Sequence, residues 1–172
     1  IVGNAAVFPR LHRLWTDMGV TASSDDCFLG LRGLRTLGVR LAHQQASGLR
    51  IAQWLRERPE VREVLHPGLP GARGHALWKR DFTGASALFG VVLHPVAPER
   101  IAAMLDGLQL FSMGFSWGGF ESLVIPTHPE RTRSATSWNP GGPCLRFAIG
   151  LEDPADLLED LAQALKRAQK AG

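Results

Sequence analysis

The chain has 172 residues, of which 45% are hydrophobic and 20% are charged, and its formal net charge is +3. That length is enough to bury the core of one domain, or of one domain and part of another. The arginines are spread without a basic block and no apolar run approaches the roughly 20 residues of a membrane helix, so we predict neither nucleic-acid binding nor a membrane span.

The first third of the chain is predicted to contain one strand followed by helices. Residues 1–8 are mostly apolar and resemble a strand. A proline and a glycine bracket a short helix over residues 10–18. Ser24, followed by two aspartates, begins a helical pattern that continues to Arg58. Gly33 and the glycines near it predict a break, after which one long helix follows.

Pro59 ends this helical stretch and marks the predicted domain boundary, between residues 1–59 and residues 60–172. The elements expected beyond it are strands over residues 61–65, 87–93, 108–111, 122–125 and 145–149, helices over residues 74–82 and 98–105, and an amphipathic helix, capped by Asp153 and Pro154, that ends the chain. Residues 127–143 are predicted to form a long loop. The uneven spacing of these elements favours a small mixed or antiparallel sheet with helices on one face, an α+β domain.

Arg146 is a residue that points to a function. It lies in an apolar strand, and a guanidinium there must be paired, because an unpaired charge in a protein interior is strongly destabilising. One possible partner is internal: Glu121, Glu152 or Asp153. The other is the carboxylate of a bound ligand, contacted by two parallel hydrogen bonds. The residues alone leave both open.

A second candidate feature is the run from Phe115 to Gly119, which contains Ser116, Trp117 and Gly118 in succession. A hydroxyl, a rigid aromatic ring and two glycines within a few residues would form a wall and main-chain donors around a small anion. The alternative is a turn between strands with the tryptophan packed in the core.

The other reactive side chains do not form a recognisable site. Cys27 and Cys144 lack the spacing of a metal site or a disulfide framework, so we expect buried, reduced thiols in a cytosolic protein. The histidines lack metal-ligand spacing, and no metal is predicted. Phosphate-binding loops, dinucleotide fingerprints and nucleophilic-serine motifs are absent. Without further comparison, the residues predict an α+β domain that binds a small carboxylate.

Three stretches, residues 33–40, 116–123 and 145–153, together resemble the transsulfuration enzymes of Cys/Met metabolism, which depend on pyridoxal phosphate. The tryptophan after Ser116 is similar to the members that cleave cystathionine by β-elimination. The γ-synthases and γ-lyases of the family typically have leucine there. Residues 74–84 also resemble the β-eliminating members.

The resemblance implies an α/β protein with the aspartate-aminotransferase-like fold, fold type I of the pyridoxal-phosphate enzymes. Residues 1–59 would be the last strand of the large cofactor-binding domain and a connecting helix, and residues 60–172 the small C-terminal domain. The chain's three lysines, Lys79, Lys166 and Lys170, have charged or polar surroundings. The lysine that binds the cofactor is therefore expected outside this chain, in a longer protein.

The resemblance also implies roles for the candidate residues. Arg146 would bind the α-carboxylate of cystathionine, Ser116 and Trp117 would complete that carboxylate site, and Phe115 and Gly118 would form its wall. The implied reaction yields homocysteine, pyruvate and ammonia for methionine biosynthesis, in a cytoplasmic homotetramer built as a dimer of dimers. Two alternatives stay open. One is a γ-synthase, a cystathionine γ-lyase or a methionine γ-lyase, and the other is a non-catalytic module that binds a carboxylate or another subunit.

Overall fold

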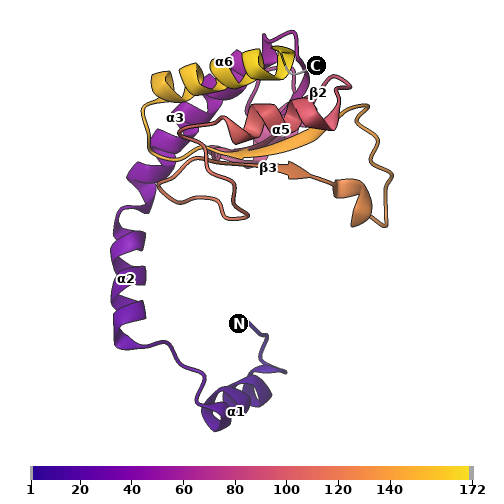
Figure 1. The fold of residues 1–172 in the computed structure, drawn as a ribbon. Coiled ribbons are helices and arrows are strands. Elements are labelled where there is room, and N and C mark those ends of the chain that lie inside the picture. The colour runs from indigo at the N-terminus through magenta and orange to yellow at the C-terminus, as the bar shows by residue number, and fades with distance from the viewer. Residues whose placement is uncertain (1, 171–172) are drawn as a thin grey trace. The chain divides into compact units, whose positions relative to one another are not determined.

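The computed structural model describes residues 2–170, and its contacts divide the chain into two units, Ile1–Gly38 and Val39–Gly172. The first unit contains helices α1 (Phe8–Met18) and α2 (Ser24–Arg35), as predicted (Figure 1). The helix α1 has a proline in its first turn and ends at a glycine with φ of 59°, a left-handed conformation that glycine adopts without strain.

The strand predicted over residues 1–8 is wrong for the residues that the structure describes. Residues 5–7 form a turn and Phe8 already begins α1, while Ile1 lies outside the described residues. An extended segment needs a neighbouring strand for its backbone N–H and C=O groups. The strands of the described chain pair with one another instead. The assignment of residues 1–59 to the end of a large cofactor-binding domain and a connecting helix stays a prediction.

The long helical stretch is interrupted at Thr36, close to the break predicted at Gly33, and continues as α3 (Leu37–Arg56). Ile51, Ala52 and Leu55 of α3 are buried in the core of the second unit. Because this part of α3 packs there, the contacts place the unit boundary at Gly38, whereas the sequence pattern placed a domain boundary near Pro59.

The second unit is built on a four-stranded antiparallel sheet with the strand order β1-β2-β4-β3. Its strands are β1 (Val61–Leu65), β2 (Leu88–Leu93), β3 (Leu123–Thr127) and β4 (Cys144–Ala148). The central strands β2 and β4 are apolar along most of their length, and their side chains on the helix-covered face are buried. The predicted α+β arrangement is confirmed.

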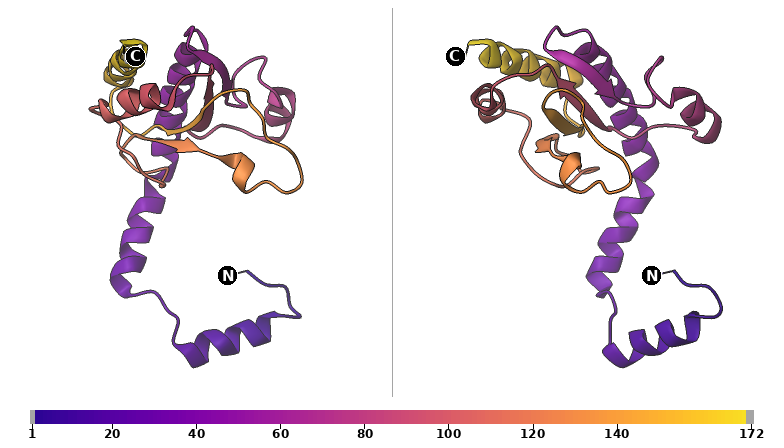
Figure 2. Two further views of the ribbon diagram at one scale, coloured as in Figure 1. Left: turned by 45° about the vertical axis from the view of Figure 1, so that its right-hand side comes forward. Right: turned by 90° about the vertical axis from the view of Figure 1, so that its right-hand side faces the viewer.

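Helices cover one face of this sheet (Figures 1 and 2). The helices α3, α5 (Pro98–Asp106) and α6 (Pro154–Lys170) contribute side chains to one core, with α5 packed against α6. The short helices α4 (His75–Asp81) and η1 (Pro129–Arg131) lie in the connections. Among residues 2–170, no helix combines the length and the apolarity needed to cross a bilayer.

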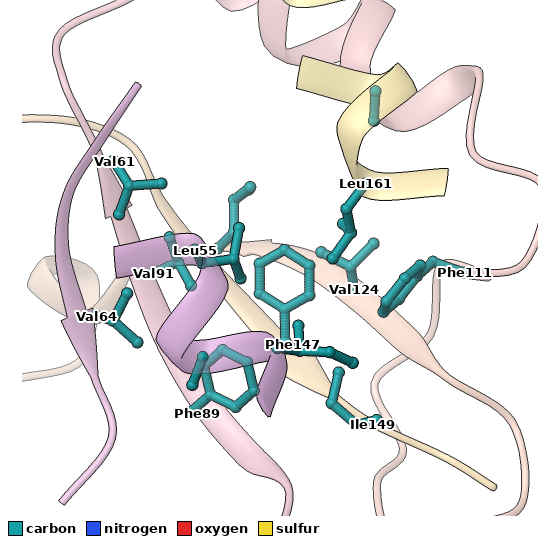
Figure 3. Close-up of a cluster of buried hydrophobic side chains, with 14 of the residues drawn as sticks. Leu55, Val61, Val64, Phe89, Val91, Phe111, Val124, Phe147, Ile149 and Leu161 are labelled. Carbon is teal, nitrogen blue, oxygen red and sulfur yellow. The ribbon is translucent and has the colours of Figure 1, made fainter. Parts of the chain in front are cut away.

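Phe147 of β4 lies at the centre of the core (Figure 3). Its ring stacks on that of Phe89 at 5.7 Å between centroids and meets the edge of Phe111 at 5.8 Å. Leu55 of α3 and Leu161 of α6 point into the same cluster. This packing immobilises β4, the strand that carries Arg146.

The strand predicted over residues 108–111 is wrong. Main-chain N–H groups of this segment donate to a side chain and not to a neighbouring strand. The buried carboxylate of Asp160 in α6 accepts the N–H of Gln109 at 3.0 Å and that of Leu110 at 2.8 Å. Phe111 is buried without forming a ladder. The apolar pattern was correct about burial but not about the backbone conformation.

The two cysteines differ in their surroundings. Cys144 is buried in β4, as expected, and burial raises the pKa of its thiol. Cys27 is exposed on α2, so the expectation of burial is wrong there. Both are free thiols, and no group of three or more potential metal ligands comes together within residues 2–170.

Candidate functional site

Strand alternation places Arg146 on the sheet face opposite to the helices. Its neighbours Leu145 and Phe147 are fully buried in the core beneath those helices, and successive side chains of a strand point to opposite faces. In the sheet register, Arg146 lies beside Gly90 of β2 and Ile125 of β3. The arginine is half-buried, so its charge stands on a rigid strand at the edge of the solvent.

The main chain of the loop before β3 holds the guanidinium of Arg146. Its Nη2 donates to the carbonyl oxygens of Phe115 at 2.9 Å and Ser116 at 3.2 Å. Its Nε is buried and has no hydrogen-bond partner among the described residues. Since a buried donor without an acceptor is costly, this nitrogen marks unused capacity for binding an anion.

The internal ion pair that the sequence left open for Arg146 is not formed. In the described part of the chain, no carboxylate lies within the 4.0 Å of an ion pair with this guanidinium. Glu152 instead accepts hydrogen bonds from the N–H and hydroxyl of Ser122 at 2.7 and 2.8 Å. Asp153 accepts the N–H two residues further on at 2.7 Å. Both carboxylates therefore already accept hydrogen bonds from groups other than Arg146.

The other predicted site residues lie around the same guanidinium. The Cζ atom of Arg146 is 5.2 Å from the centroid of the Trp117 ring, a cation–π distance. Trp117 is 59% exposed, so the alternative that it is a core residue is wrong. Gly118 has φ of 77°, where a residue with a side chain would be strained. Phe115, whose carbonyl contacts Arg146, has its ring in solvent.

The loop that carries these residues, residues 113–121, which we call the site loop, is closed at its base. The N–H of Ser112 donates to the carbonyl of Ser122 at 3.0 Å. The buried hydroxyl of Ser122 accepts the N–H of Gly150 at 2.9 Å. A Cβ atom at Gly150 would lie 2.2 Å from the carbonyl oxygen of Phe120, so this crossing requires a glycine.

Sequence reasoning missed several groups that hold the site loop. Gln44 of α3 donates to the carbonyl of Gly119 at 2.7 Å, although the two residues are 75 positions apart. The Ser122–Glu152 pair was also not predicted, because Glu152 was considered as a partner of Arg146. No local pattern distinguishes such residues, since only the fold brings them to the loop. The observed contacts of the loop also use carbonyl oxygens, whereas main-chain donors were expected.

Residues 1–166 match the family model described as Cys/Met metabolism PLP-dependent enzyme, in which PLP is pyridoxal phosphate. The chain belongs to this family. The cystathionine β-lyases of Salmonella typhimurium (strain LT2) and Escherichia coli (strain K12) are 46% and 44% identical to it over 96% of the chain. The chain spans 43% of the length of each, less than half of these curated relatives.

A solved structure of the family has the same fold. The cystathionine γ-synthase from Xanthomonas oryzae pv. oryzae, in complex with aminoacrylate and cysteine, matches all of this chain with a TM-score of 0.82 and 34% identity. The chain covers 46% of that structure. The predicted fold type and the predicted dependence of the family on pyridoxal phosphate are confirmed.

The described residues fit the substrate side of such a site rather than the cofactor side. Lys79, Lys166 and Lys170 are exposed, whereas a lysine that reacts with the cofactor must be desolvated or beside another cation to lose its proton. The buried carboxylate of Asp160 is occupied by two main-chain N–H groups and is not available to a ring nitrogen. Arg146, with its unpartnered Nε, is suited to bind the carboxylate of an amino acid.

Proposed function

We propose that the protein to which this chain belongs is a carbon–sulfur lyase that cleaves cystathionine by β-elimination. With one water consumed, the products are homocysteine, pyruvate and ammonia. The observation that carries this proposal is the guanidinium of Arg146, which is half-buried, has no carboxylate partner among the described residues and has Trp117 beside it. The similarity to two cystathionine β-lyases at 46% and 44% identity supports the choice of reaction.

In this proposal Arg146 binds the α-carboxylate of the substrate and fixes its orientation. Nη2 is already held by the carbonyl oxygens of the site loop, so the guanidinium cannot rotate freely. When bound, pyridoxal phosphate supplies the electron-withdrawing ring that makes the Cα proton acidic. Correct orientation of the Cα–H bond against that ring lowers the barrier by several kcal/mol, and this orientation is the contribution of Arg146.

The site loop completes the carboxylate site. We infer that Ser116 lies beside the bound carboxylate and that the ring of Trp117 covers the guanidinium, keeping water from the ion pair and so strengthening it. Phe115 and Gly118 form the wall: the carbonyl of Phe115 orients Arg146, and Gly118 allows the main chain to turn. None of these groups has to carry a proton in the reaction.

One observation favours a second reaction class. The solved structure described above is a cystathionine γ-synthase. Carboxylate binding by an arginine suits γ-chemistry equally well, because both reactions begin at Cα. The deciding feature in our proposal is Trp117, since the γ-type members that the sequence resembles typically have leucine there. A non-catalytic module that binds a carboxylate is the third possibility.

The test is incubation of the full-length protein with cystathionine, followed by separation of the products. Pyruvate with homocysteine supports β-cleavage. Formation of 2-oxobutyrate with cysteine would instead assign γ-cleavage. A full-length protein that shows no visible absorption band of bound cofactor and no product would establish the non-catalytic alternative.

We further infer a cytoplasmic homo-oligomer, a dimer of dimers, from the family resemblance. The free thiols Cys27 and Cys144 agree with a reducing compartment. Light scattering of the full-length protein during size-exclusion chromatography tests the tetramer, and a monomeric mass would exclude it.

A further inference from the structure

Gln44 is a buried polar residue that reaches the site loop from α3. Its side chain is 3% exposed, and its Nε2 donates to the carbonyl of Gly119 at 2.7 Å. A carbonyl oxygen can only accept, so the amide nitrogen of Gln44 must face it. A buried glutamine without such a partner would be destabilising. The hydrogen bond therefore connects α3 to the site loop.

This contact holds the end of the site loop that Arg146 does not hold. The guanidinium binds the carbonyl oxygens of Phe115 and Ser116, at the first half of the loop. Gly119 lies after the left-handed turn at Gly118, where glycine permits many backbone conformations. The hydrogen bond from Gln44 therefore restrains the part of the loop that its own sequence leaves most mobile.

Trp117 lies between these two attachment points. Its ring is 59% exposed, and it contacts Arg146 through one cation–π interaction. Packing alone therefore does not fix the position of the ring. If the Gly119 end moves, the ring moves away from the guanidinium, and the side chain of Ser116, which Arg146 holds only through the carbonyl of that residue, loses its orientation. The geometry of the carboxylate site then depends on a side chain that does not belong to it.

We propose that Gln44 is a positioning residue, which acts through the carbonyl of Gly119 to hold Ser116 and Trp117 against Arg146. This inference rests on the proposed function, because it assumes that the site loop contacts the substrate carboxylate. Gln44 itself touches neither the substrate nor the reacting atoms.

The neighbouring residue Gln45 provides a matched control. It is half-buried on the same helix, and its Oε1 accepts the N–H of Ala85 at 2.6 Å. Gln45 thus also links α3 to a distant main chain, but at the start of β2 and away from the site loop. A purely structural role of Gln44 predicts that both glutamines matter in the same way.

The experiment compares Gln44→Met and Gln45→Met in the full-length holoenzyme. Methionine has similar length but neither the amide N–H that Gln44 donates nor the amide oxygen with which Gln45 accepts, so each variant loses one hydrogen bond. We expect Gln44→Met to raise KM for cystathionine about tenfold, with kcat changed less than about threefold, because the substrate carboxylate is bound less well in the ground and transition states alike. For Gln45→Met we expect KM to stay within about twofold of wild type.

Two readouts do not depend on turnover. The dissociation constant of glycine, which carries the α-carboxylate but has no group to eliminate, is expected to rise about tenfold in Gln44→Met and not in Gln45→Met. Amide hydrogen exchange is expected to speed up in residues 115–121 of Gln44→Met alone. Equal effects in both variants, or faster exchange without weaker glycine binding, would overturn the proposal.

These readouts also separate this proposal from the proposed function. A wild-type holoenzyme that converts no cystathionine contradicts the β-lyase assignment, while the glycine measurement still tests Gln44. Should Gln44→Met fail to fold, Gln44→Asn serves instead, because it keeps a buried amide but is one methylene too short to reach Gly119. The same tenfold loss of glycine affinity is expected for it, and unchanged affinity would reject the role of Gln44.

Discussion

Arg146 and Trp117 touch each other, yet different forces hold them in place. Arg146 stands on β4, whose neighbouring side chains Leu145 and Phe147 are fully buried under three helices. Trp117 stands on the site loop, where Phe115, Trp117 and Phe120 are all largely exposed. The strand is positioned by apolar packing and the loop by a few hydrogen bonds. The charge of the site is therefore placed rigidly, whereas the groups around it depend on polar contacts that a single substitution can remove.

Breaking the packing beneath the strand should give the largest effect. We expect Phe147→Ala to lower the free energy of unfolding by about 3–5 kcal/mol, because the ring is fully buried and a cavity remains. Phe115→Ala, in a loop position that is 81% exposed, should change it by about 0.5 kcal/mol or less. Denaturant unfolding of the full-length proteins measures both. Similar losses would mean that the loop is part of the packed core after all.

Removal of the charge should leave the strand folded and disable the site. We expect Arg146→Ala to lower kcat/KM for cystathionine about 100-fold, through a higher KM and a lower kcat, since a charge-assisted bidentate contact is lost. Arg146→Lys should recover only part of this, because an ammonium lacks the planar fork. Circular dichroism checks that both variants keep the fold. Wild-type kinetics in Arg146→Ala would reject the carboxylate contact.

His66, a polar side chain inside the packed region, should make the stability of the fold depend on pH. His66 is 1% exposed, lies against Phe89, and accepts the N–H of Gly68 at 3.0 Å on Nδ1. Burial lowers the pKa of His66 from 6.5, against a smaller opposing effect of the Ser86 backbone. The unfolded chain therefore binds the proton more readily, and stability should fall as the pH drops below 6.5, by at most about 1.4 kcal/mol per pH unit.

The variant His66→Asn tests this, since its Oδ1 can still accept from Gly68 but does not titrate. We expect this variant to lose part of the decline in melting temperature between neutral and mildly acidic pH. Its KM at neutral pH should stay unchanged, because the contacts of His66 are with Gly68 and Phe89 and not with the site loop. An identical pH profile in wild type and variant would show that His66 is not responsible.

The smallest expected effect is on the loop side. Trp117→Leu should raise KM about two- to fivefold, the value of one exposed cation–π contact. Phe120→Leu is the matched control, because Phe120 is exposed on the same loop and the described chain has no arginine over its ring. Steady-state kinetics with product analysis measures both, and a shift from pyruvate toward 2-oxobutyrate in Trp117→Leu would sharpen the role of this position. Equal KM changes in the two variants would contradict a specific contact with Arg146.

Much of the fold could be predicted because its signals are local. Proline and glycine mark the ends of α1, short apolar runs mark β2 and β4, and the face of leucines marks α6. Arg146 and Trp117 were singled out in the sequence as candidate site residues, since a charge in an apolar strand and a tryptophan beside two glycines are both unusual. The failures were segments whose partners are distant. Within residues 108–111, Gln109 and Leu110 donate to Asp160, and residues 1–8 have no strand beside them in the described chain.

The sequence by itself determined the family and the strands of the sheet, and it predicted that Arg146 acts together with Ser116 and Trp117. These inferences depend on residue types and short spacings. Only the tertiary structure decided how the arginine is satisfied. Among the described residues it forms no ion pair with Glu121, Glu152 or Asp153. It binds the carbonyl oxygens of the site loop instead and leaves Nε without a partner in the described chain. It also brought Gln44 to Gly119. Hydrogen-bond partners across many residues are set by the packing of helices on the sheet, and no local pattern encodes that packing.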